Sequence, residues 1–313
     1  MEEKKALLQE QFDAFLQADA LEEILSVIGT DRSHLAEKYG GRRKASGGIM
    51  EAQDIAAMPE LAEVREQLFP LFGELGSFDI GSPCRGDHNR LLIYGGALGA
   101  CFDRTLYSVP FLTERTGSVD ALTCYRPINP VERIRTRSIS SAETEAGAMT
   151  EAMEKTYELS DGTWEESFSG DRNLNAVTCR KTYRGGTCRI SKGDDPGTVN
   201  CEDPRAPVYR VFMAPSSEPR LRRADTGDCI AYYLQLTGPK EGDSFLAVTN
   251  RRFCNRQFIQ TAYQLIQKDC PVDFDIVGCH RGGIAPTADT YDPLQYLQDL
   301  IGILDWIERF RQL

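Results

Sequence analysis

The sequence is poor in histidine and contains no apolar run of the length that a membrane span needs. Its three histidines, His34, His88 and His280, are far apart and show no metal-ligand spacing. A GxSxG motif is also missing, which excludes the commonest arrangement of a serine hydrolase. The N-terminus is charged and amphipathic rather than apolar, so we expect neither a signal peptide nor a membrane-spanning helix.

The chain carries 47 acidic and 36 basic residues, a formal net charge of −11. This charge disfavours nucleic acid as a partner, although a local basic patch can still bind one small anionic ligand. The ten cysteines include no CxxC pair and lie within predicted strands and helices, so we expect reduced thiols in a soluble, cytoplasmic protein. Cys179, Cys188 and Cys201 form a local cluster without a nearby histidine, and we expect no metal there.

Residues 225–279 alternate between helix and strand patterns. Asp225 and Asp228 suit the start of a helix that Gly238 ends, and two short apolar strands follow at 244–248 and 274–277. Three more apolar runs read as strands, at 91–94, 119–124 and 208–213. Strands that alternate with helices predict an α/β fold with a mainly parallel sheet of about five strands, flanked by helices.

Two segments interrupt this pattern. Residues 1–88 look helical and polar, and we interpret them as an N-terminal extension or cap on an α/β domain at 89–313. Residues 160–206 are rich in Gly, Asp, Ser and Thr, and we expect an inserted β-hairpin there, with strands at 176–183 and 187–190 around Arg184-Gly185-Gly186. The final helix, from Pro293, is amphipathic and packs on the sheet or forms the seam of a homodimer.

Glycine and polar residues follow the predicted strands at the edge where parallel sheets bind ligands. Gly95-Gly96 joins the first strand to a helix, where a backbone that turns tightly can approach a ligand. Arginines can bind phosphate or carboxylate in a bidentate manner, and helix N-termini favour anions. The candidate ligand-binding residues are Gly95, Gly96, Arg104, Arg126, Thr226, Thr249, Asn250 and Arg256.

Asp228 or Glu132 is the candidate catalytic base, because no histidine is placed for that role. Each residue also has a plainer interpretation. Asp228 and Thr226 can simply begin a helix, and Arg126 with Glu132 can form a loop ion pair. His280 follows the last predicted strand, where it could reach the same edge or lie on a surface loop.

Three segments resemble the YdcF/SanA/ElyC-like family, known as the domain of unknown function family 218. Residues 92–96 (LIYGG) with Arg104 are similar to its first motif, residues 223–228 (RADTGD) to its second, and residues 248–256 (VTNRRFCNR) to its third. The family's serine, tyrosine and histidine fall on Asn250, Arg252 and Phe253, so a role of that histidine in relatives cannot apply here. The resemblance covers about residues 90–290. It implies a Rossmann-like fold; one member is associated with S-adenosylmethionine binding and others with envelope biogenesis.

Three functions fit these patterns. The first is a protein that binds, and in an enzyme transforms, a small nucleotide-like or phosphate-bearing ligand. The second is an S-adenosylmethionine-binding protein or methyltransferase, which ranks lower because Cys124-Tyr125-Arg126 provides no acid after the second strand for a ribose. The third is a non-catalytic sensor or interaction protein that binds a regulatory ligand without turnover.

Overall fold

The computed structural model describes residues 2–39, 55, 58–78, 81, 83–84, 86–136, 139–190, 197–279 and 293–313. The chain forms two compact units. Met1–Ile80, Arg251–Asp269 and Thr287–Leu313 make up the first, and Gly81–Asn250 and Cys270–Pro286 make up the second.

The second unit contains a sheet, which has eight strands in the described residues. Five of them run parallel to one another: β1 (Arg90–Tyr94), β2 (Ser118–Cys124), β6 (Val208–Ala214), β7 (Ser244–Asn250) and β8 (Asp273–Cys279). The other three are antiparallel: β3 (Ser160–Ser169), β4 (Thr178–Ile190) and β5 (Gly197–Asn200). The order across the sheet is β3-β4-β6-β2-β1-β7-β8, with β5 paired to β4.

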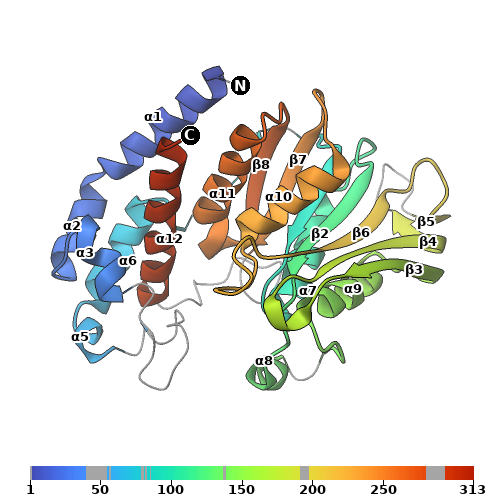
Figure 1. The fold of residues 1–313 in the computed structure, drawn as a ribbon, viewed down its shortest axis with the longest axis horizontal. Coiled ribbons are helices and arrows are strands. Elements are labelled where there is room, and N and C mark those ends of the chain that lie inside the picture. Colours follow the sequence, from blue (N-terminus) through green and yellow to red (C-terminus); the bar gives the residue numbers. More distant parts are fainter. Residues whose placement is uncertain are drawn as a thin grey trace. The chain divides into compact units, whose positions relative to one another are not determined.

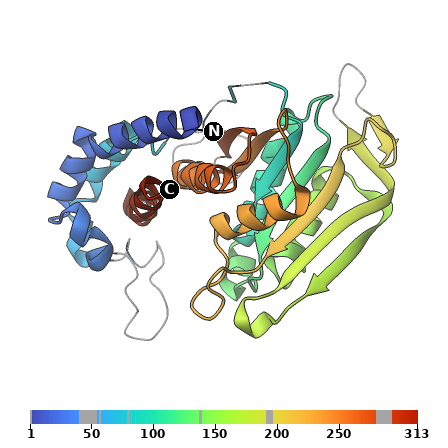
Figure 2. The ribbon, with the colours of Figure 1, turned by 45° about the horizontal axis from the view of Figure 1, so that its top comes forward.

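Helices of the second unit cover both faces of this sheet. The helical segments are α7 (Leu98–Ser108), η1 (Val109–Phe111), α8 (Pro130–Arg135), α9 (Glu145–Thr156), η2 (Arg172–Leu174) and α10 (Thr226–Thr237). Helices α7 and α9 pack against each other on one face, and α10 packs on β2 and β6 from the other (Figure 1, Figure 2). On that second face, the ring of Tyr233 contacts Phe212 and Phe245.

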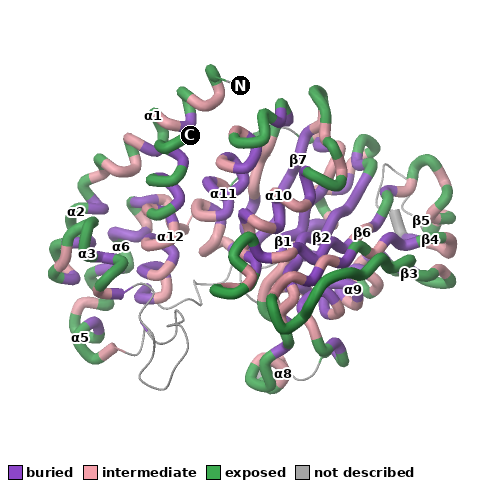
Figure 3. The backbone as a smooth tube through the Cα atoms, viewed as in Figure 1, coloured by how far each residue is buried: buried purple, intermediate pink, exposed green. Residues whose placement is uncertain are grey.

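The central strands are buried because both of their faces are covered. Every residue of β2 and of β7 is buried, whereas β3 is exposed along most of its length (Figure 3). Leu91, Ile93, Val119 and Ala121 join the core beneath α7 and α9. Continuous burial of this kind is typical of parallel strands with helices on both sides.

The chain changes direction across the sheet after β6. From β1 it passes to β2 and β6 on one side, and then crosses to β7 and β8 on the other side of β1. After β1 the chain continues toward one side of the sheet, and after β7 it continues toward the other side. The carboxyl ends of these two neighbouring parallel strands lie next to each other. Such switch points are where α/β sheets usually hold ligands.

The α/β class and the mainly parallel sheet are as the sequence predicts. The strands that the 160–206 insertion adds to the sheet differ from the prediction in number and position. The sheet has eight strands rather than about five, because the 160–206 insertion extends it with β3, β4 and β5. The hairpin turn expected at Arg184-Gly185-Gly186 is wrong. Gly185 and Gly186 have positive φ values of 62° and 67° inside β4, where the strand changes partners from β6 to β5.

The first unit is helical in its described residues. Its segments are α1 (Glu2–Leu16), α2 (Asp19–Val27), α3 (Arg32–Tyr39), α5 (Pro59–Ala62), α6 (Arg65–Glu74), η3 (Arg251–Phe253), α11 (Cys254–Gln267) and α12 (Pro293–Arg311). Helix α12 contributes Leu297 to one apolar cluster with α2 and α6, and Ile307 to another with α1 and α11. Where the sequence suggested a boundary near residue 88, α11 and α12 group with the N-terminal helices. No helix among the described residues is both long enough and apolar enough to span a membrane.

Candidate functional site

The turn between β1 and α7 is shaped by two glycines. The N–H of Gly95 donates to the carbonyl of Leu122 on β2, at 2.7 Å. A Cβ at Gly95 would lie 2.1 Å from Oε1 of Glu145 and 2.9 Å from the Leu122 oxygen. Gly95 therefore lets the carboxylate of Glu145 approach the backbone more closely than any side chain would allow.

Arg126, just beyond β2, binds this turn to two carboxylates. It donates from Nε to Oε2 of Glu145 at 2.9 Å and from Nη1 to Oε1 of Glu132 at 2.5 Å. Its Nη2 donates to the carbonyl of Gly96 at 2.7 Å. Burial alone would lower the pKa of Arg126, but hydrogen bonds and charge attraction from the two glutamates raise it, so the group stays protonated.

The amino end of α7 is capped by a residue from another element. The preceding residue, Ala97, offers no side-chain oxygen, and the N–H of Leu98 instead donates to Oε2 of Glu132 on α8, at 2.7 Å. Burial would raise the pKa of Glu132, yet the hydrogen bonds from Arg126 and Leu98 outweigh it and lower the pKa. A carboxylate thus occupies the position where the positive end of a helix dipole attracts an anion.

Arg104 lies across the switch point between β1 and β7. It is 1% exposed, and its Nε donates to Oδ1 of Asn250 at the end of β7, at 2.7 Å. Its Nη1 donates to the carbonyls of Tyr94, at 2.7 Å, and Gly95. Asn250 continues the network with a contact of 3.4 Å from Nδ2 to the sulfur of Cys279 on β8. Arg104 therefore links the ends of β1 and β7, and Asn250 extends the contact to β8.

Asp228 belongs to a separate cluster at the start of α10. Asp225 caps this helix by accepting from the N–H of Asp228, and the Asp228 carboxylate accepts from the N–H of Asp225, each at 3.0 Å. Nη1 of Arg222 donates to the same carboxylate at 2.6 Å. Burial would raise the pKa of Asp228, but the bonds from Arg222 and Ser217 lower it. Thr226 is the first residue of the helix.

The remaining candidates lie apart from the turn. Thr249 is fully buried in β7. Arg256 is on α11, in the first unit, where its Nε lies 3.1 Å from Oδ1 of Asp299 on α12 in an ion pair without hydrogen-bond geometry. A Cβ at Gly302 of α12 would lie 2.5 Å from Cδ of Arg256, so the glycine makes room for this side chain. His280 lies outside the described residues.

Cysteines near the turn are not activated as nucleophiles. Burial raises the pKa of Cys101 to about 12, and burial likewise raises the pKa of Cys279 to about 12. The pKa values of Cys124 and Cys229 are raised by burial as well. Thiols with such values are protonated at neutral pH and do not supply the thiolate that covalent catalysis requires. Within the described ranges, no three His, Cys, Asp or Glu side chains are grouped to hold a metal ion.

The structure therefore brings six candidates into one network and leaves four outside it. Gly95, Gly96, Arg104, Arg126, Glu132 and Asn250 are connected by the hydrogen bonds above. Thr226 and Asp228 form the cap of α10, Thr249 is within β7, and Arg256 is in the other unit. Within this network Arg126 forms ion pairs with Glu132 and Glu145, whereas Arg104 bonds to an amide and to backbone carbonyls.

Glu145 is the member of this network that sequence reasoning missed. It begins α9, after the capping Thr144, and its Oε1 accepts from the N–H of Cys124 at 3.3 Å. An acid in the first turn of a helix is ordinary, so its position carried no sign of a role beside β2. Its place beside β2 is set by the pairing of its segment with the loop after that strand, where the N–H of Glu145 donates to the carbonyl of Arg126 at 2.9 Å, and nothing in the sequence marks this pairing.

Comparisons with protein-family models, with curated proteins and with solved structures found no match for this chain.

Proposed function

We propose that this chain binds a small nucleotide-like or phosphate-bearing ligand at the β1–α7 turn. The strand order supports the proposal. Taken in chain order, the five parallel strands lie in the sequence 3-2-1-4-5, which is the order of the Rossmann fold. Dinucleotides bind in that fold at the crevice between the first and fourth strands, which here are β1 and β7. The resemblance to the YdcF/SanA/ElyC-like family is part of the same proposal.

The observation that carries the proposal is the carboxylate of Glu132 at the amino end of α7. In dinucleotide-binding folds this position receives the pyrophosphate. Here an oxygen anion of the chain itself accepts from Leu98 N–H and from Arg126. The next amides, of Gly99 and Ala100, have no carbonyl partner within the helix, as in the first turn of any α-helix. A ligand phosphate that replaced Glu132 would find these donors already directed at it.

The replacement requires movement of a short element only. Glu132 lies on α8, Pro130–Arg135, between β2 and α9. Exposed Val131 and Ile134 on α8 contribute little to the core. Moving this helix would leave the hydrogen bonds of the sheet unchanged, but it would break the contacts of Glu132 and the hydrogen bonds from Arg133 to the carbonyls of Ser140 and Ala142.

S-adenosylmethionine is a second candidate, favoured by Glu145. Rossmann-type sites commonly hold ribose hydroxyls with an acid at the end of the second strand. The chain after β2 provides none, but the carboxylate of Glu145 lies at that strand end, 3.3 Å from Cys124 N–H. The ribose hydroxyls of a bound nucleoside would then donate hydrogen bonds to the Glu145 carboxylate, in place of the bond that Arg126 now donates.

We propose binding without turnover at this site, the behaviour of a sensor. Glu132, the candidate base within the network, is already bound to Arg126 and to Leu98 N–H, which lower its pKa, and a carboxylate with a lower pKa is a weaker base. Asp228, the other candidate base, lies in the separate cap of α10. A cytoplasmic location is part of the proposal and is supported by the ten cysteines, all of which are free thiols.

A thermal-shift screen of the full-length protein against nucleotides, S-adenosylmethionine and sugar phosphates tests the proposal, because a ligand of the folded state raises the midpoint. We expect Glu132→Gln to bind the anionic ligand about fivefold more tightly, since the neutral amide no longer competes as an anion at the helix N-terminus. Glu143→Gln, a neutralisation at an exposed position of the same loop, should leave the affinity unchanged.

Either of two results would count against binding at the turn. One is that no ligand class shifts the midpoint of the wild type or of Glu132→Gln. The other is that a ligand binds both proteins equally well. A shift by S-adenosylmethionine or adenosine without one by sugar phosphates would instead favour the nucleoside, and Glu145→Gln should then weaken it.

A further inference from the structure

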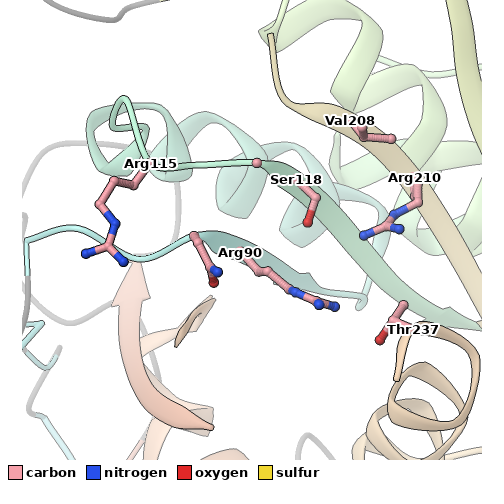
Figure 4. A pocket seen from close by; sticks show the side chains of 8 residues that line it. Arg90, Arg115, Ser118, Val208, Arg210 and Thr237 are labelled. Carbon is pink, nitrogen blue, oxygen red and sulfur yellow. The ribbon is translucent and has the colours of Figure 1, made fainter. Parts of the chain in front are cut away.

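An open depression of about 370 Å³ lies at the amino ends of the parallel strands, the opposite end of the sheet from the β1–α7 turn (Figure 4). Its lining residues come from the starts of β1, β2 and β6, from the loop before β2 and from the end of α10. They are Asn89, Arg90, Arg115, Gly117, Ser118, Val208, Arg210 and Thr237. Three of these residues are arginines, and no acidic residue is among them.

The depression exists because α10 ends before it reaches the first residues of the strands. Arg90, Ser118 and Val208 are register partners across β1, β2 and β6, so their side chains share one face of the sheet. One turn before the end of α10, Tyr233 still covers the next row, where its hydroxyl donates to Asp120 at 2.8 Å. The helix stops at Thr237, and the outermost row is left without a helix above it.

Arg210 and Arg90 are held in place by carboxylates that lie outside the lining. Arg210 donates in a bidentate manner to Asp120, which is 0% exposed, at 2.6 and 2.9 Å. Arg90 donates to Asp243 at 2.6 Å. A guanidinium has five N–H donors, and the bidentate pair uses two of those of Arg210. Figure 4 shows both guanidinium groups extending toward the same space between Ser118 and Thr237.

We propose that this depression binds a phosphate group, either as inorganic phosphate or on a small ester. Fixed guanidinium groups with N–H donors to spare are suited to tetrahedral oxyanions, which accept several hydrogen bonds at once. The lining is polar apart from Val208 and Gly117. Each of its arginines is also paired with a carboxylate, Arg115 with Asp87, so the unused N–H donors rather than an excess of positive charge favour an oxyanion. The volume accommodates a phosphate with a few further atoms, and the net charge of −11 disfavours a nucleic-acid phosphate.

The test is titration of the full-length protein with inorganic phosphate at low ionic strength, followed by ³¹P NMR and calorimetry. Val208→Asp adds a carboxylate at the rim, at a position that is 40% exposed. Repulsion between that charge and a phosphate dianion about 5 Å away should weaken binding about tenfold. Val208→Asn has nearly the same shape without the charge and should stay within about twofold of the wild type.

Two further variants complete the design. Leu174→Asp adds the same charge at a position of similar exposure, 44%, on η2, and should leave phosphate binding unchanged. Arg115→Gln removes one exposed lining cation and leaves its partner Asp87 without that charge, so it should weaken phosphate binding several-fold even if Val208→Asp folds poorly. Glycerol phosphate added in competition distinguishes the two sources: tighter binding of the ester assigns an ester ligand, and equal or weaker binding assigns the free ion.

Equal affinity of Val208→Asp and Val208→Asn, with Arg115→Gln also unchanged, would overturn the inference, as would the absence of saturable phosphate binding by the wild type. The outcome is separable from that of the proposed function. Phosphate binding that responds to Glu132→Gln but not to Val208→Asp belongs to the β1–α7 turn, and would overturn the inference while supporting a ligand at the turn.

Discussion

The arginines of the network around the β1–α7 turn are engaged with carboxylates, an amide and backbone carbonyls. At the β1–α7 turn, Arg126 bonds to Glu132 and Glu145, and buried Arg104 bonds to Asn250 and backbone carbonyls. Burying charge is costly unless hydrogen bonds replace those to water. Such pairs fix the geometry of the turn, and a ligand there has to exchange with a contact that already exists.

Asp299 differs from these residues because its compensation is incomplete. It is 3% exposed on α12, and burial raises its pKa against the opposing charges of Arg256 and Arg252. Because the pKa of Asp299 is raised in the folded state, its protonated carboxyl contributes fully to stability below the pKa of the unfolded chain, which is near 4. This contribution is lost as the pH rises through the folded-state pKa. Ionised Asp299 is thus a source of instability at neutral pH.

We expect Asp299→Asn to gain stability relative to the wild type between pH 4 and pH 7, by about 1.4 kcal/mol for each unit by which the pKa is raised. Urea unfolding of both proteins across this range measures the difference. Asp305→Asn is the control, since Asp305 is exposed on the same helix and pairs with Arg309 at 3.0 Å. A difference that does not change with pH would mean that Asp299 titrates normally in the folded protein.

At the scale of residues, the sequence predicted where polar groups follow strands but not where their side chains point. Asn250 and Arg126 were identified because they follow apolar runs, and both are in the network. The partnership of Arg104 with Asn250 spans 146 residues, and that of Gly95 with Glu145 depends on a clearance that only coordinates reveal. Spacing along the chain contains no information on such pairs.

Among the elements, helix α10 is the clearest case of a local signal that determines local structure. Asp225 and Asp228 form the capping box that their spacing suggests, and Gly238 ends the helix with a φ of 49°. Asp228 also accepts from Arg222 and from Ser217 N–H, so its carboxylate has more bonds to lose than that of Asp225.

We expect Asp225→Ala to lower the free energy of unfolding by about 1 kcal/mol, as for other caps. Asp228→Ala should cost more, about 2–3 kcal/mol, because a half-buried charge-assisted pair is lost as well. Since the pKa of Asp228 is lowered, its contribution is present above the unfolded value and is lost as the pH falls through the folded pKa. Urea midpoints at pH 7 and pH 3 measure both effects; equal losses at both pH values would rule out the ion pair as the cause.

The parallel strands were predictable as elements, and the insertion was not. Each parallel strand is mostly apolar and bounded by turn residues, although β2 and β6 include the charged residues Asp120 and Arg210. Strand β3, SDGTWEESFS, is mostly exposed and has no such run, so its place in the sheet depends on pairing with β4. The glycine pair of β4 looked like a turn because positive φ is usual there, whereas in this sheet it allows one strand to change partners.

On the scale of the whole molecule, the sequence order of the elements does not match their grouping. The first unit takes its helices from both ends of the chain and from between β7 and β8. The sequence of helix α12 does not indicate whether the helix packs on a sheet or on other helices, because an amphipathic stripe suits both kinds of packing. Its partners became apparent from the cluster that it forms with α2 and α6.

This grouping predicts the effect of removing the N-terminal segment. A chain that begins at Gly81 lacks α1, α2, α3, α5 and α6, and so leaves Leu294, Leu297 and Leu300 of α12 without the cluster that buries them. Each of these leucines loses burial worth about 1.5–3 kcal/mol, so α12 should lose its protection against amide hydrogen exchange. Strands β1 and β2 should stay protected, because α7, α9 and α10 belong to the second unit. Hydrogen exchange of the full-length and the truncated chain, followed by mass spectrometry, measures the protection of each element. If α12 were as protected in the truncated chain as in the full-length chain, the N-terminal helices would be dispensable to its folding.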